Sequence, residues 1–120
     1  MGYSTYFRGQ FLLDRPLTVE HKRILDEFNE ADHRDDIGMP GIWCGWRPSE
    51  DGTAIVHDGG EKFYDYIEWM QYLCDHFLTP WGYMVAGIVE WEGEENTDMG
   101  RMVISSPNKV TAQYAVITYR

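Results

Sequence analysis

"GIVEWEGEENTDMGRMVI", residues 87–104, has the pattern of a β-hairpin with an acidic turn. In its first half, Val89 and Trp91 alternate with Glu90 and Glu92, and this period of two indicates a strand with one buried and one exposed face. Five carboxylates fall within nine residues that include no Lys or Arg: Glu90, Glu92, Glu94, Glu95 and Asp98. We therefore expect a hairpin that its apolar positions hold to a core, while its other positions and its turn present negative charge.

The segments before and after this hairpin predict further strands and a short helix. "YSTYFRGQFLL" is rich in aromatic and β-branched residues, and "SEDG" is an Asp-Gly type of turn between two apolar runs. Thr18 is placed to cap a helix whose apolar stripe reaches Ala31, and a polar loop follows at 31–41. The predicted strands are 3–13, 42–48, 53–58, 82–92, 100–105 and 109–119.

A second helix is predicted by an apolar stripe with helical spacing that ends before Pro80. The stripe consists of Phe63, Tyr66, Ile67, Met70, Leu73, Cys74 and Phe77. Asp58 and Glu61 resemble a capping box, so we expect the helix to begin directly after Asp58. The opposite face of this helix carries the acids Glu61, Asp65, Glu68 and Asp75.

The resulting element order is β-α-β-β-α-β-β-β in a single domain that covers residues 1–120. An antiparallel sheet of about five to six strands with both helices on one face satisfies this order, which is an α+β fold. The first six elements follow the ferredoxin-like order, and two strands are added after them.

The charge of the chain is concentrated in one part of it. The net charge is −10, and residues 50–98 hold twelve acids but a single base, Lys62. The rest of the chain holds eight acids and nine bases. A negative field of this kind repels nucleic acid and anionic membranes and attracts basic surfaces. We therefore expect a basic protein surface as the partner, with no direct contact to nucleic acid or membrane.

Several features point to the cytoplasm. No window of eighteen apolar residues is present, and "MGYSTYFRGQF" lacks the basic and apolar regions of a secretory signal. Cys44 and Cys74 lie in apolar surroundings, as reduced buried thiols of cytosolic proteins do. A disulfide or a metal site is the alternative for these two residues.

Motifs for catalysis, for metal binding and for cofactor binding are weak in this sequence. We predict a non-enzymatic protein that holds neither a metal nor a cofactor. The acidic loop lacks the glycine and glutamate spacing of an EF-hand, although it offers Asp32, His33, Asp35 and Asp36 as ligands. A zinc site would lack a C-x-x-C pair and would have to draw on Cys44, His57, Cys74 and His76.

Several motifs resemble those of a family of small acidic, uncharacterised proteins from phages and bacteria. The matching stretches are "MGYSTYFRGQFLLDRPLT" (1–18), "GGEKFYDY" (59–66), "PWGY" (80–83), the G.V.W.GE pattern at 87–94, and "DMGRMVI" (98–104) at the place of the family's D.G.I.V pattern. The resemblance implies a fold and a phage or mobile-element origin more than an activity. Ile88 departs from it, because a polar residue is expected there, and we predict a contact patch at this position.

By analogy with anti-CRISPR proteins, we expect a phage-derived anti-defence inhibitor in the bacterial host cell. Its acidic face would bind a basic, nucleic-acid-binding surface of a CRISPR-Cas complex. The predicted partner-binding residues are Glu61, Asp65, Glu68, Glu90, Glu92, Glu94, Glu95, Asp98, Trp46, Trp69 and Ile88. The alternative is an interaction or scaffold domain of a phage or mobile element, without inhibitory activity, that forms a homodimer through its apolar sheet face.

Overall fold

The acidic hairpin forms two neighbouring strands of a six-stranded sheet, β4 (Val85–Gly93) and β5 (Met99–Ser105). The computed structural model describes residues 3–60, 62–105 and 107–116. Its other strands are β1 (Thr5–Leu13), β2 (Trp46–Pro48), β3 (Ala54–His57) and β6 (Lys109–Tyr114). Its helices are α1 (Val19–Glu30), α2 (Tyr66–Leu73) and the π-helical turn η1 (Cys74–Leu78), which continues α2.

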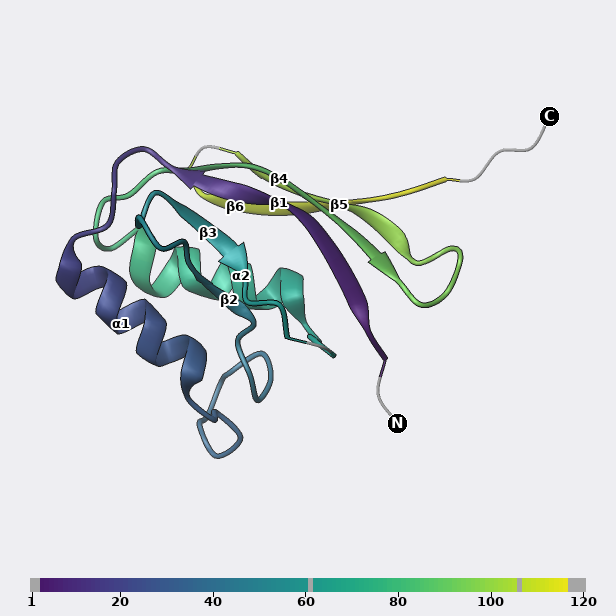
Figure 1. Cartoon of the computed structure of the whole chain (residues 1–120), viewed down its shortest axis with the longest axis horizontal. Helices are drawn as coiled ribbons and strands as arrows, with labels where there is room; N and C mark the ends of the chain where they lie inside the picture. The colour runs from purple at the N-terminus through teal and green to yellow at the C-terminus, as the bar shows by residue number, and fades with distance from the viewer. Residues whose placement is uncertain (1–2, 61, 106, 117–120) are drawn as a thin grey trace.

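The sheet has the strand order β2-β3-β1-β4-β5-β6, and every neighbouring pair is antiparallel. Figure 1 shows α1 and α2 on the same side of this sheet. The predicted α+β class, with an antiparallel sheet and two helices on one face, is therefore confirmed. The ferredoxin-like description of the strand order stays a prediction.

The alternation predicted for the hairpin is confirmed. Val89 and Trp91 point toward the helices and are buried, whereas Ile88, Glu90 and Glu92 point to the other side and are exposed. The buried side joins one apolar core under the helices, which also contains Phe11, Trp46, Met70, Leu73, Met102 and Ile104. The opposite side of the sheet, which we call the open face, has no helix over it (Figure 1).

The two helices differ in how well the sequence predicts their starts. Thr18 caps α1 as expected, because its side-chain oxygen accepts a hydrogen bond from the His21 amide at 3.1 Å. The capping box at Asp58 is wrong: α2 begins only at Tyr66, and the Asp58 carboxylate accepts hydrogen bonds from the Gly60 amide and the Asn29 side chain. Its predicted partner, Glu61, lies outside the described residues. Phe63 still enters the core, but it does so from the loop before α2.

Two predicted strands are longer than the observed ones. The segment 42–48 contributes only Trp46–Pro48 to the sheet, and ahead of that strand the Cys44 carbonyl accepts a hydrogen bond from Asn29 of α1. The segment 109–119 is a strand to Tyr114, and residues 117–119 lie outside the described part of the chain. No helix within the described residues has the length and apolar character needed to cross a membrane.

The centre of the sheet depends on two glycines in the β1–β4 pair. Gly9 has φ +103° and Gly87 has φ +137°, which is backbone conformation that favours glycine. A Cβ atom at position 9 would lie 2.6 Å from the Ile88 carbonyl oxygen, and one at position 87 would lie 2.9 Å from that of Gln10. These glycines allow the two strands to approach and twist where nine residue pairs align.

We predict that Gly9→Ala lowers the free energy of unfolding by more than about 1–3 kcal/mol, the usual cost of a strained backbone position. The additional loss comes from the collision with the Ile88 carbonyl. Gly38→Ala is the matched control, because Gly38 also has positive φ but a Cβ atom added there would meet no other atom within 4 Å. Urea denaturation of both variants measures the difference, and equal losses would contradict the proposed close approach.

Candidate protein-binding surface

The acids of the hairpin occupy two neighbouring places on the molecule. Glu90 and Glu92 lie on the open face, and Glu94 and Glu95 lie in the turn between β4 and β5; all four are exposed. None of them forms an ion pair with a Lys or Arg of residues 3–60, 62–105 or 107–116 within 4.0 Å.

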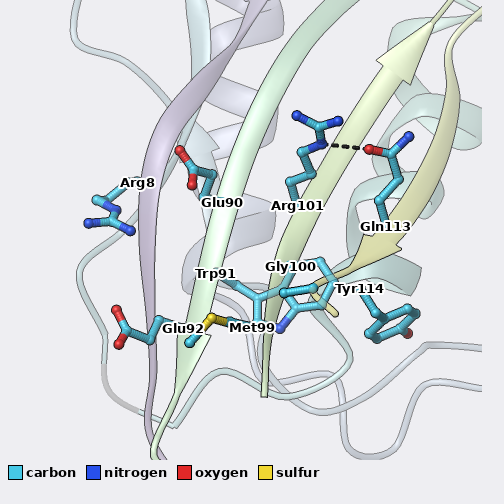
Figure 2. A pocket seen from close by; sticks show the side chains of 10 residues that line it. Arg8, Glu90, Trp91, Glu92, Met99, Gly100, Arg101, Gln113 and Tyr114 are labelled. Atoms are coloured by element: carbon cyan, nitrogen blue, oxygen red, sulfur yellow. Dashed lines mark hydrogen bonds between the residues drawn. The ribbon is translucent and has the colours of Figure 1, made fainter. Parts of the chain in front are cut away.

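Strand register gives Glu90 basic neighbours that the hairpin sequence does not contain. Glu90 lies opposite Arg8 on β1 and opposite Arg101 on β5, and Figure 2 shows the three side chains in one row. Opposite charges in such cross-strand positions attract each other even without a close contact. The charge of Glu90, one of the predicted partner-binding residues, is therefore partly offset.

This row of side chains borders a shallow hollow of about 530 Å³ on the sheet. Its lining includes Arg8, Glu90, Glu92, Met99, Arg101 and Gln113 (Figure 2). The Arg101 guanidinium donates a hydrogen bond to the Gln113 side-chain oxygen at 2.5 Å. Sequence reasoning missed these basic and amide residues because they come from three other strands. The alternation of inward-facing and outward-facing residues around Arg8 and around Arg101 was the signal in the sequence that could have placed these two side chains on the exposed face of the sheet.

Across the whole open face, basic residues outnumber acids. By register and alternation, this face carries Arg8, Arg47, Arg101 and Lys109 against Glu90 and Glu92. The acidic surface therefore lies at the turn of the hairpin and not over the sheet as a whole.

Asp98 has a structural role in the turn. Its carboxylate accepts hydrogen bonds from the Tyr3 hydroxyl at 2.7 Å and from the Trp91 indole N–H at 3.0 Å. Its backbone carbonyl accepts a further bond from the Gly93 amide at 2.7 Å. Because both carboxylate oxygens are engaged inside the protein, Asp98 is a poor candidate for partner binding, in contrast to the prediction from sequence.

Tyr3 joins the hairpin turn to the segment before α2. Its hydroxyl also accepts a hydrogen bond from the Glu95 amide at 3.0 Å, and its own amide donates to the Tyr64 hydroxyl at 2.9 Å. Asp65, the residue after Tyr64, is exposed and caps α2 with φ 58°. The Asp65 carboxylate lies beside Gly41, so this link does not bring it to the turn acids.

The remaining predicted acids do not join this group. Glu68 is an exposed residue of α2, on the side of the sheet opposite to Glu90 and Glu92. Glu61 lies outside the described residues. Helix and hairpin acids therefore do not form one continuous surface, because the sheet separates them.

Two of the three predicted apolar anchors are wrong. The side chain of Trp46 is 1% exposed and that of Trp69 is 0% exposed, because both pack in the core between helices and sheet. The Trp46 indole also donates a hydrogen bond to the Tyr66 carbonyl at 2.8 Å. Ile88, at 48% exposure on the open face, keeps the accessibility that an anchor needs.

Four acids of α1 and its following loop have a local Lys or Arg counter-ion, unlike the glutamates of the hairpin turn. Arg23 pairs with Glu20 and Glu27 on the same helix, Lys22 pairs with Asp26, and Arg34 pairs with Asp32 in the loop. Such helical pairs at spacing three or four cancel much of the local charge. The hairpin turn thus differs from this segment in keeping its glutamates unpaired among the described residues.

The candidate metal residues are engaged elsewhere. His33 contacts the Phe28 carbonyl through Nε2 and the Asp36 carboxylate through Nδ1, each at 2.9 Å. Cys44 and Cys74 are free and buried, and burial raises the pKa of each thiol to about 12. No group of three or more His, Cys, Asp or Glu side chains within the described residues is arranged to hold a metal ion.

Comparisons of this chain with protein-family models, with curated proteins and with solved structures gave no match. The resemblance to the phage and bacterial family stays a prediction.

We predict that Asp98→Ala lowers the free energy of unfolding by about 1–3 kcal/mol, because it leaves the buried indole N–H of Trp91 without its acceptor. Glu92→Ala is the matched control, since it removes an exposed carboxylate from the same hairpin. Thermal or urea unfolding of both proteins checks the prediction. A loss no greater than that of the control would show that the indole finds another partner.

We also predict that acid weakens the fold through His57. Burial lowers the pKa of this ring from its ordinary value of 6.5, and its Nε2 atom has no hydrogen-bond partner among the described residues. The His57 ring therefore binds a proton more readily in the unfolded chain than in the folded protein. The stabilisation of the fold by the neutral ring is fully present above about pH 6.5 and is lost as the pH falls.

The His57→Phe variant keeps an aromatic ring beside Phe7 and Phe63 but cannot titrate. Unfolding free energies measured between about pH 7 and pH 5 should fall less steeply for this variant than for the wild type. Parallel curves would contradict the role of His57.

Proposed function

We propose that the protein is a phage-derived, anti-CRISPR-like inhibitor that acts in the cytoplasm of a bacterial host cell. Its acidic hairpin end binds a basic surface of a CRISPR-Cas complex, where that complex otherwise holds nucleic acid. The contacting acids are Glu92, Glu94 and Glu95. The inhibitor acts by occupying this surface and needs no catalysis.

One observation carries this proposal: the exposed Glu92, Glu94 and Glu95 lie close together in the chain without a Lys or Arg partner among the described residues, whereas four acids of α1 and its loop are paired. An unpaired carboxylate can engage a partner's Lys or Arg without first breaking an internal pair. A side chain that is already paired has to give up that interaction. The turn therefore offers adjacent carboxylates that are available to a basic partner.

The geometry of the hairpin also fits a row of basic side chains. Alternate residues of a strand lie roughly 6.6 Å apart, while phosphates of one DNA strand lie about 3.4 Å apart. The acids do not copy the phosphate spacing, but they present several charges over a short distance. Attraction of this kind gives fast association that weakens as salt rises.

Ile88 supplies an apolar contact beside these charges. It lies on the same face of β4 as Glu90 and Glu92 and is half exposed. Exposed apolar residues next to a charged rim are typical of protein interfaces. Its position extends the proposed contact from the turn onto the open face.

The direct test is charge neutralisation of the hairpin end. The triple variant Glu92→Gln, Glu94→Gln, Glu95→Gln should bind purified CRISPR effector complexes about tenfold more weakly, or worse, because three charge pairs are lost. The Glu94 side chain accepts a hydrogen bond from the Ser4 amide at 2.8 Å, and a glutamine at this position keeps an oxygen that can accept the same bond. Biolayer interferometry over a range of salt concentrations measures the effect.

The matched control is the triple variant Glu20→Gln, Glu27→Gln, Glu30→Gln on α1, which changes the net charge equally. It should bind like the wild type if the position of the charge matters. An equal loss of affinity in both triple variants would show that binding depends on net charge and not on the position of the charge. Wild-type affinity in the hairpin variant, or no binding to any effector, would contradict the proposal.

The exposed apolar residues of the open face favour a second candidate function, an interaction or scaffold domain. Tyr6, Leu12 and Ile88 are all exposed there. A homodimer formed through this face would cover them. Ile88→Lys would disrupt such a dimer, and light scattering would detect the change.

A further inference from the structure

The two edges of the sheet differ in how they are protected against further strand pairing. β2 has three residues, and they include Arg47 and Pro48. A short strand with a charge and a proline is a usual way to block an edge. β6 has six residues and carries one charge, Lys109, at its start; the stretch 110–116 that continues from it, "VTAQYAV", contains neither charge nor proline. The β6 edge therefore lacks the protection that the β2 edge has.

The backbone of β6 presents free groups along this edge. The Ala115 amide donates to the Met99 carbonyl at 2.9 Å, so the odd-numbered residues bond to β5. The even-numbered residues then direct their N–H and C=O groups away from the sheet, because these directions alternate along a strand. The amides of Ala112 and Tyr114 have no acceptor among the described residues.

A side chain of α2 closes only the first part of the edge. The Gln71 carboxamide accepts a hydrogen bond from the Val110 amide at 2.9 Å and donates one to the Asn108 carbonyl at 3.2 Å. It takes the place that a neighbouring strand would occupy there. Residues 112–116, which we call the free stretch, follow this point.

The side chains along the free stretch are apolar and exposed. Tyr114 is 69% exposed, although its ring contacts the buried Trp91 at 5.3 Å between centroids, and Figure 2 shows the two side by side. Val116 is 87% exposed. A large exposed aromatic ring next to a core residue is a surface that a partner strand can cover.

We propose that residues 112–116 pair with the same residues of a second copy of this chain, antiparallel and across a two-fold axis. Tyr114 then lies opposite Tyr114 of the second copy, and Ala112 lies opposite Val116. This register satisfies the outward backbone groups of both copies with about six hydrogen bonds. It joins two six-stranded sheets into one.

The lack of charge on the free stretch allows a second copy to approach there. The net charge of −10 makes most surfaces of two copies repel each other, but the stretch 110–116 carries no charge. A self-complementary, uncharged edge is what a two-fold contact requires. Gln71 limits the pairing to the stretch after Val110, so the contact is short.

The pairing leaves the acidic hairpin turn and the open face uncovered, so the inference does not rest on the proposed function. It also differs from a dimer formed through the open face. Since only five residues of each copy take part, we expect the contact to bury less than the roughly 1,200–2,000 Å² of a standard interface and to be weak and reversible.

Sedimentation velocity of the wild-type protein from roughly 5 to 500 μM should show a reversible monomer–dimer equilibrium in this range. Tyr114→Pro should shift it to monomer, because proline removes the central outward N–H and is tolerated where that N–H faces away from the sheet. Val116→Lys, which changes a highly exposed side chain, should weaken the dimer without disturbing the core.

Ile88→Lys is the control, since it adds the same charge on the open face and should leave this dimer intact. Hydrogen exchange at the Ala112 and Tyr114 amides of the wild type should slow as its concentration rises. A monomer at every concentration would overturn the proposal. So would a dimer that Ile88→Lys abolishes and Val116→Lys preserves, or capture of this edge by an extended peptide in place of a second copy.

Discussion

The antiparallel pairing of β1 with β4 is the constraint on which the rest of the structure depends. It aligns nine residue pairs from Thr5 opposite Gly93 to Leu13 opposite Val85. β3 and β2 extend the sheet beyond β1, and β5 and β6 extend it beyond β4. A shift of one residue in this register would turn Val89 and Trp91 to the open face and bring Glu90 and Glu92 under the helices. The close approach at Gly9 and Gly87 makes that register specific.

This pairing also separates the two tasks of the hairpin. Its inward residues build the core, so its outward residues and the glutamates of its turn are free to vary in charge at little cost to stability. The same register that buries Trp91 places Glu90 between two arginines from other strands. Negative charge therefore accumulates at the turn, where Tyr3 and Asp98 hold the backbone and leave the neighbouring glutamates exposed. The proposed binding function uses charges that the fold itself does not need.

Local patterns predicted those parts of the structure that local forces decide. The alternation in 87–92, the Thr18 cap and the hairpin around "SEDG" all follow from short-range preferences, and each is confirmed. The start of α2 was mispredicted because Asp58 bonds to Asn29, a residue far away in the sequence. The burial of Trp46 and Trp69 and the position of Arg8 beside Glu90 depend on packing and register. For the same reason the site was predicted only in part: its acids are adjacent in sequence, but its arginines are not.

The most direct measurement of the central claim is a competition experiment between this protein and nucleic acid. The protein is titrated, at fixed salt, into a purified CRISPR effector complex that holds fluorescent target DNA, and the anisotropy of the DNA is followed. The account predicts that the anisotropy falls toward that of free DNA, because the acidic hairpin end and the DNA backbone require the same basic surface. Simultaneous binding, with the anisotropy unchanged or raised while the protein joins the complex, would contradict it.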